Sequence, residues 1–260
     1  MLQLSKNLSA ICVWLLALLV SVSVAQISSQ QTSASPDRDR GIELYQQGDA
    51  NGAVEALRHA VQNNEKDGTA WHYLGLAYLL KGSKDEARKS FARAVAVREA
   101  AMQPPATVAA TIPDPAGARQ KRSESFQAAA ESLEKYLELT RNPDSIILEE
   151  LDSLRWYRDY YSGTRNDEEI VTTKEATTRL RIVDKPPPNF SGTRAAGTGS
   201  LRAVFSADGT VKHILVIRKV DPGFDRACIL AAKRIQFEPA VKDGRPVSMI
   251  LEVEYARYIY

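Results

Sequence analysis

The sequence predicts a multidomain chain in which an all-α array of helical repeats precedes a small α+β domain. Three observations support this fold class. Two stretches that begin at Gly41 and Gly75, 34 residues apart, align without a gap. From Gly199 onward, apolar residues recur with the period of a strand instead of that of a helix. Residues 26–173 carry a net charge of −5 and residues 174–260 a net charge of +6, as expected for two modules.

The first residues are typical of an export signal. Lys6 is the last charged residue before Asp37, and residues 10–20 are all apolar. The small residues that end at Ala25 predict cleavage of a signal peptide after that position. The alternative is an uncleaved membrane anchor, because residues 8–25 are uncharged and just long enough to span a bilayer. Either way, the bulk of the chain is expected outside the cytoplasm.

The expected divisions of the chain follow from shifts in composition and period. They are a signal peptide or anchor (1–25), a disordered stretch (26–36), a repeat domain (37–161) with a Pro-rich loop (102–116), a polar linker (162–176) and the C-terminal domain (177–260).

The aligned positions of the two copies have the sizes that packed helix pairs need. The pairs are Gly41 with Gly75, Gly48 with Gly82, Ala53 with Ala87, Leu57 with Phe91 and Ala60 with Ala94. Small residues allow close helix crossings, Leu57 and Phe91 fill the seam, and Gly48 and Gly82 end helices with positive φ. The pattern resembles the tetratricopeptide repeat, a family that forms solenoids and commonly binds peptides in a concave groove. Helix register then gives the candidate groove residues Arg38, Tyr45, Gln46, His72 and Leu76.

A third copy is incomplete. The segment 117–140 is expected to form one long helix, while four prolines exclude a regular helix just upstream. A further helix is expected to begin at Asn142-Pro143, with Asn as its N-cap. Its single apolar face suits a helix that closes the open end of a short array.

The C-terminal stretch predicts a β-hairpin, a helix and a last strand. The three strands would form an antiparallel sheet, accompanied by one or two helices. Asp208-Gly209 indicates a tight turn. The strand that follows it, 210–220, is largely apolar on both faces and is therefore expected at the centre of the sheet. Cys228 is alone in the exported chain and is expected to be buried on the helix. The last strand, 247–258, follows a reversal near Asp243-Gly244.

Six short stretches together resemble the TonB C-terminal domain. They are "PNF" at 188–190, Gly199, "FSADGTV" at 205–211, "GFDRAC" at 223–228, "FEPA" at 237–240 and "GRPV" at 244–247. The resemblance covers about residues 177–260. It implies that the last strand pairs with a segment of an outer-membrane receptor by strand addition. The candidate partner-binding residues on one face of that strand are Met249, Leu251, Val253 and Tyr255. The alternative is a strand that only completes the sheet or pairs with a second copy.

No pattern indicates an enzyme, a cofactor or a metal site. The sequence has no Gly-rich phosphate loop with Lys, no Cys pair and no His-x-x-x-His. His59, His72 and His213 belong to three different predicted elements and lack the spacing of metal ligands. No Lys/Arg run is dense enough for nucleic-acid binding.

The leading hypothesis is a protein-interaction adaptor in the periplasm or cell envelope of a Gram-negative-type bacterium. Its repeats would hold one protein or peptide while the last strand pairs with another, such as an outer-membrane receptor segment in transport. One alternative is an energy transducer anchored in the inner membrane by residues 8–25 and coupled to a proton-driven motor. The absence of His from that segment speaks against this alternative. Another is a scaffold that forms homodimers. The opposite net charges of the two modules would also let them dock on each other.

Overall fold

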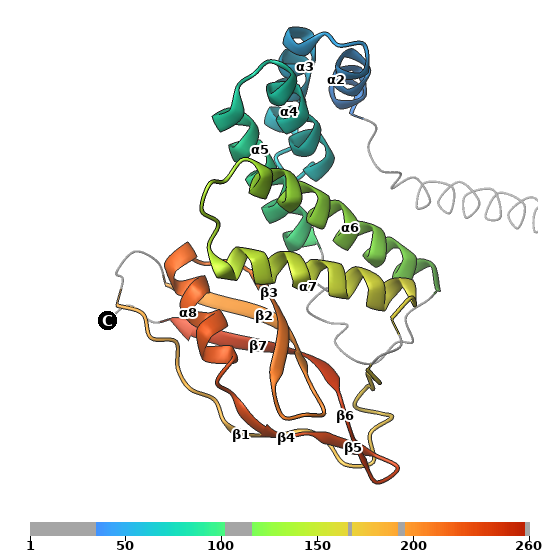
Figure 1. Cartoon of the computed structure of the whole chain (residues 1–260), viewed down its shortest axis with the longest axis vertical. Coiled ribbons are helices and arrows are strands. Elements are labelled where there is room, and N and C mark those ends of the chain that lie inside the picture. The colour runs from blue at the N-terminus through green and yellow to red at the C-terminus, as the bar shows by residue number, and fades with distance from the viewer. Residues whose placement is uncertain (1–34, 102–115, 166–167, 192–195, 258–260) are drawn as a thin grey trace, which may run out of the picture.

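The computed structural model describes residues 35–101, 116–165, 168–191 and 196–257. The predictions for the signal peptide or anchor, for residues 26–34 and for most of the Pro-rich loop lie outside these ranges. None of the described helices is long and apolar enough to cross a membrane. Figure 1 shows a stack of helices that rests on a small sheet.

The N-terminal array consists of helices that pack against their neighbours in chain order (Figure 1). Within the described residues they are α2 (Pro36–Gln46), α3 (Ala50–Asn63), α4 (Gly68–Leu80), α5 (Lys84–Ala101), α6 (Ala116–Glu138) and α7 (Ser145–Ser162). Gly48 and Gly82 follow α2 and α4 with φ of 83° and 84°, which confirms the predicted helix ends. A Cβ at Gly75 would lie 2.6 Å from the ring of Phe91, so only Gly fits this crossing of α4 and α5.

The third helix pair is α6 with α7. The long helix expected at 117–140 is present as α6 and packs against both α5 and α7. The predicted start of α7 at Asn142-Pro143 is wrong. Asp144 caps the helix instead, because its Oδ1 accepts a hydrogen bond from Ile146 N at 3.0 Å, and the first helical residue is Ser145.

The C-terminal sheet is antiparallel with the strand order β3-β2-β7. Its strands are β2 (Gly197–Phe205), β3 (Val211–Arg218) and β7 (Met249–Arg257), and α8 (Pro222–Ala232) packs on one face. The fold class predicted from the sequence is confirmed. The predicted central position of the second hairpin strand is wrong, because β2 lies in the centre and β3 lies at an edge. β3 is apolar on both faces because α8 covers one face and α7 covers the other.

Two smaller ladders flank this sheet. β1 (Arg181–Asp184) pairs with β4 (Gln236–Glu238), and β5 (Ala240–Lys242) pairs with β6 (Arg245–Val247). The predicted reversal is the β5–β6 turn, where Asp243 and Gly244 have φ of 52° and 77°. The polar stretch predicted as a linker contains Val171, which is buried with Ala240 and Val247. That part of the stretch therefore packs on the C-terminal domain.

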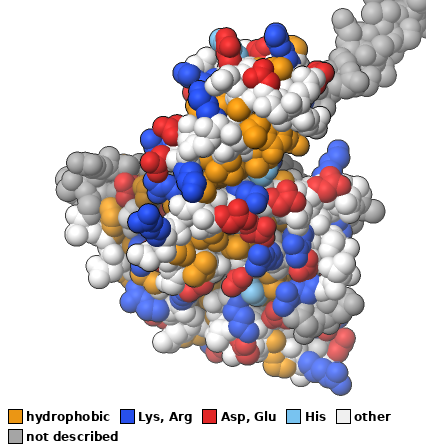
Figure 2. Space-filling view, turned by 45° about the horizontal axis from the view of Figure 1, so that its top comes forward, with side chains coloured by type: hydrophobic (Ala, Val, Ile, Leu, Met, Phe, Trp, Pro, Cys, Tyr) orange, Lys and Arg blue, Asp and Glu red, His pale blue; other side chains and the backbone are white. Residues whose placement is uncertain are grey.

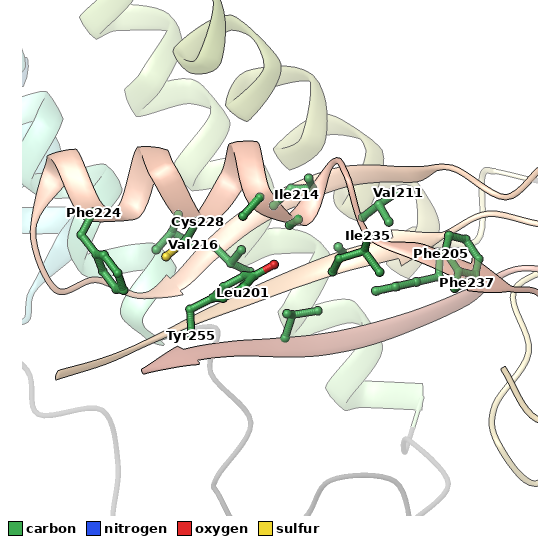
Figure 3. Packing of buried hydrophobic residues seen from close by; sticks show 14 residues of the cluster. Leu201, Phe205, Val211, Ile214, Val216, Phe224, Cys228, Ile235, Phe237 and Tyr255 are labelled. Atoms are coloured by element: carbon green, nitrogen blue, oxygen red, sulfur yellow. The ribbon is translucent and has the colours of Figure 1, made fainter. Parts of the chain in front are cut away.

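One face of the sheet forms a core with α8 (Figure 3). Phe224 and Cys228 come from α8, and Leu201, Val216 and Tyr255 come from the three strands. The free thiol of Cys228 is buried, as predicted, and burial raises its pKa to about 12. The thiol is therefore a core group that stays protonated.

The opposite face of the sheet forms a second core with the helical array. Val204 and Leu215 are buried there against Leu154 and Trp156 of α7. Ion pairs surround this contact: Asp144 with Arg226, Glu149 with Lys233, and Glu99 with Lys219. In each pair the acid comes from the array and the base from the C-terminal domain, so the modules dock through opposite charges around an apolar centre.

Candidate protein-interaction site

β7 is an edge strand whose pairing with β2 is regular. Nine consecutive residue pairs join the two strands, from Gly197 with Arg257 to Phe205 with Met249, with no shift of register. Within the described residues β2 is the only strand beside β7. As far as the described residues show, the other side of β7 has no strand beside it, and the segment around Ile170 bridges only to Ser248, just before the strand begins.

The outward main-chain groups of β7 belong to its even-numbered residues. Just before the strand, Ser248 N donates to Glu169 O at 3.2 Å, and Ser248 O accepts from Val171 N at 2.9 Å. Both groups of Ser248 thus point away from β2, and every second residue along the strand points the same way. These residues are Ile250, Glu252, Glu254 and Ala256.

A side-chain contact supports this assignment. Lys185 Nζ donates to Glu254 O at 2.8 Å, and the same ammonium lies 5.0 Å from the centre of the Tyr255 ring. No other hydrogen bond from described residues reaches the outward main-chain groups of residues 250–256. The free main-chain groups of this edge allow a second polypeptide to pair with it. The Lys beside the edge, in turn, is a common protection of edge strands against unwanted pairing.

The side chains that the sequence singled out on β7 lie in the core. Met249, Val253 and Tyr255 are at most 4% exposed, and Leu251 is partly buried beside them. As predicted, the side chains of these odd-numbered residues face one side of the sheet, and those of the even-numbered residues face the other. The three buried side chains cannot contact a partner. A partner at this edge would meet the main chain.

The other edge of the sheet, β3, is irregular. Its ladder with β2 changes register twice, between Ser200 and Leu201 and between Arg202 and Val204. At the second irregularity His213 has a φ of 48°, and its ring stacks on Trp156 at 4.7 Å. Burial and the charge of Arg165 lower the pKa of His213 to about 4. Bulges of this kind bend an edge and interrupt further pairing.

The candidate groove residues of the array lie on α2 and α4. Arg38 pairs with Asp39 and with Asp67, and the Tyr45 ring meets Tyr73 edge-on. Gln46 is exposed, and Leu76 is half-buried. Leu80, one helical turn after Leu76 and absent from the sequence-based candidates, is 49% exposed. Figure 2 shows hydrophobic side chains gathered on one face of the helical part of the molecule.

His72 contributes to helix packing more than to an open surface. Its Nδ1 lies 2.9 Å from Ser132 Oγ of α6, and its ring meets Phe91 edge-on at 5.5 Å. Burial and the nearby Arg98 lower its pKa to about 4, so the imidazole is neutral near pH 7. The neutral ring links α4 to α6 along the array.

Comparison with known families assigns both modules. Residues 38–104 match the family model of the tetratricopeptide repeat, and residues 187–256 match that of the Gram-negative bacterial TonB protein C-terminal. The chain carries tetratricopeptide repeats and a TonB C-terminal domain. No curated protein matches it. Both are non-enzymatic families of protein-interaction domains, and the TonB domain is one of the Gram-negative cell envelope.

The stretch between the two matches contains α6 and α7. This helix pair covers the sheet of the TonB C-terminal domain on the face opposite α8. The TonB match includes β2, β3, α8 and most of β7, so the open edge belongs to the domain itself. Among the described residues no three His, Cys, Asp or Glu side chains are grouped to hold a metal ion.

Proposed function

We propose that this protein is an adaptor of the Gram-negative cell envelope that binds an extended segment of a partner protein along the outer edge of β7. The observation that carries the proposal is the regular edge with outward main-chain groups at Ile250, Glu252, Glu254 and Ala256. Strand addition uses such an edge, and main-chain hydrogen bonds supply the affinity. The TonB match favours an outer-membrane receptor segment as the partner.

The contrast between the two edges of the sheet supports β7 as the binding edge. Bulges interrupt β3, whereas β7 pairs with β2 over nine residues without a shift of register. Because Lys185 Nζ occupies Glu254 O, an incoming strand has to displace one side-chain hydrogen bond. Each main-chain hydrogen bond gained contributes about 1 kcal/mol net, so several offset this loss.

The repeats would hold a second protein. The partly exposed apolar residues Leu76 and Leu80 on α4 suit an apolar stretch of a peptide. The two binding surfaces belong to modules that share a core, so the adaptor would present both partners in a fixed relation.

A proline at an outward position tests the strand-addition proposal. Glu252→Pro removes an N–H that does not point toward β2, so the fold should persist, as edge strands tolerate such prolines. A proline at Leu251 or Val253 would instead remove an N–H directed at β2 and break the internal ladder. We expect Glu252→Pro to weaken binding of a receptor-segment peptide by about tenfold, the effect of roughly one main-chain hydrogen bond plus the steric effect of the ring.

Glu252→Ala is the matched control, because it removes the same carboxylate and keeps the N–H. Binding is measured by fluorescence anisotropy, and circular dichroism checks that the variants are folded. If Glu252→Pro binds the peptide as tightly as Glu252→Ala does, the partner does not pair with this edge.

A further inference from the structure

A cluster of three charged side chains, with Glu99 buried, Glu150 partly buried and Lys219 more exposed, joins the two modules. Glu99 lies on α5, Glu150 on α7, and Lys219 directly after β3. Lys219 Nζ is 2.8 Å from Glu99 Oε2 and 3.9 Å from Glu150 Oε1. The side chain of Glu99 is only 2% exposed. The cluster therefore places two array carboxyls on one cation of the TonB C-terminal domain.

The cluster holds more negative than positive charge when all three groups are ionised. Neither Glu99 oxygen has a hydrogen bond of good geometry with a described residue, although Lys219 is close. Burial, and then the charge of Glu99, raise the pKa of Glu150 well above its ordinary value. Burial by itself would lower the pKa of Lys219, but the two carboxyls raise it above its usual range. Asp225 of α8 is the other acid that acts on Lys219.

Water can reach this cluster. A cavity of about 730 Å³ lies between α7, β3 and α8, and Glu150 and Lys219 are among the residues that line it. The ion pairs Asp144–Arg226 and Glu149–Lys233 also belong to its lining. Protons can therefore exchange with Glu150 while the modules stay docked.

We propose that Glu99, Glu150 and Lys219 form a pH-sensitive lock that holds the TonB C-terminal domain on the repeats. With a proton on Glu150, one carboxylate faces one ammonium across the interface. Without it, two carboxylates, of which Glu99 is buried and Glu150 partly buried, share a single Lys, and docking weakens. The inference is independent of the proposed function, because it concerns how the modules are held together.

The direction of the pH dependence follows from linkage. When the modules separate, Glu150 regains its ordinary pKa of 4.5, whereas in the docked state its pKa is raised. The docked state therefore binds the proton more tightly and is favoured at low pH. Docking weakens as the pH rises above 4.5, by up to about tenfold per pH unit, and levels off above the raised pKa.

The test compares the full exported chain with Glu150→Gln between pH 5 and pH 8. The neutral amide imitates the protonated carboxyl, so the variant should lose the pH dependence that Glu150 causes. We expect its melting temperature to exceed that of the native chain at pH 8, by about 3–5 °C for each tenfold change in docking, and to approach it at pH 5. Glu99→Gln should also reduce the pH dependence, because Glu150 then lacks its acidic neighbour.

Glu149→Gln is the matched control, since it is the adjacent residue on α7 and its ion pair with Lys233 is exposed. It should keep the pH dependence of the native chain. Small-angle X-ray scattering should show the native chain becoming more extended at pH 8 than Glu150→Gln. The proposal is overturned if Glu150→Gln has the same pH slope as the native chain, or if the slope changes while the two scattering curves stay identical.

Discussion

A fragment of residues 168–260 should be far less stable than the same segment in the whole chain, and it should self-associate. The fragment keeps α8 but loses α7, so the second face of the sheet is uncovered. Val204 and Leu215 are at most 2% exposed in the whole chain and would both face water. Each loses about 1.5–3 kcal/mol of burial. A contiguous apolar face of this kind favours association between copies.

Sedimentation velocity and thermal unfolding of the purified fragment measure this effect. The matched control is the same fragment with Val204→Thr, Leu215→Thr and Ile250→Thr, which retains strand-forming residues and makes the uncovered face polar. The triple variant should be the more monomeric of the two. A native fragment that is monomeric and melts at the temperature of the whole chain would show that the helical array does not stabilise the TonB C-terminal domain.

Replacing Trp156 with Ala should destabilise the whole chain by about 3–5 kcal/mol, the usual loss for a large buried aromatic side chain. Trp156 is 2% exposed and joins the helical array to the sheet. Its ring stacks on His213 of β3 at 4.7 Å and on Tyr160 at 5.5 Å, and Arg165 lies 5.4 Å from its centre. Urea unfolding gives the free energy of unfolding.

Trp156→Phe separates lost packing from a lost polar contact. The indole Nε1 has no hydrogen-bond partner among the described residues, so Phe gives up ring area and no hydrogen bond. We expect it to cost about 1–2 kcal/mol, clearly less than Ala. Equal losses for Phe and Ala would contradict this, because a phenyl ring would then stabilise the chain no more than a methyl group and ring packing would not be what Trp156 contributes.

The features that the sequence predicted correctly depend on local signals. One helix crossing requires a small residue at Gly75 and a large one at Phe91. The spacing of the repeat revealed both positions in the sequence. The Asp208-Gly209 pair located the hairpin in the same way, but the predicted two-residue turn is wrong, because Ser206 pairs with Thr210 around three residues and only Gly209 among them has a positive φ, of 83°. Fold class and domain order could be predicted for this reason.

The position of β3 could not be predicted, because its cause lies in another module. An apolar strand is expected where both faces are covered, and a central place in the sheet is the common solution. Here α7, some fifty residues upstream, covers the second face of an edge strand. Nothing near β3 in the sequence indicates that contact.

The last strand was predicted from its alternation, but the sequence did not show that the side chains chosen as partner contacts lie in the core. Alternation along β7 separates two faces, yet core-facing and partner-facing side chains give the same pattern. Val253 and Tyr255 are core residues. The register with β2 decides which amides of β7 point outward. The structure shows this register through the hydrogen bonds of residues 248 and 254, which the sequence does not contain.

Residue-resolved hydrogen exchange along β7 tests the open edge most directly. In the free monomer, the amides of Leu251, Val253 and Tyr255 should exchange slowly, and those of Glu252, Glu254 and Ala256 rapidly. A bound receptor-segment peptide should slow the second set. Equal protection of both sets in the free monomer, or no change on binding, would contradict an edge that is available to a partner.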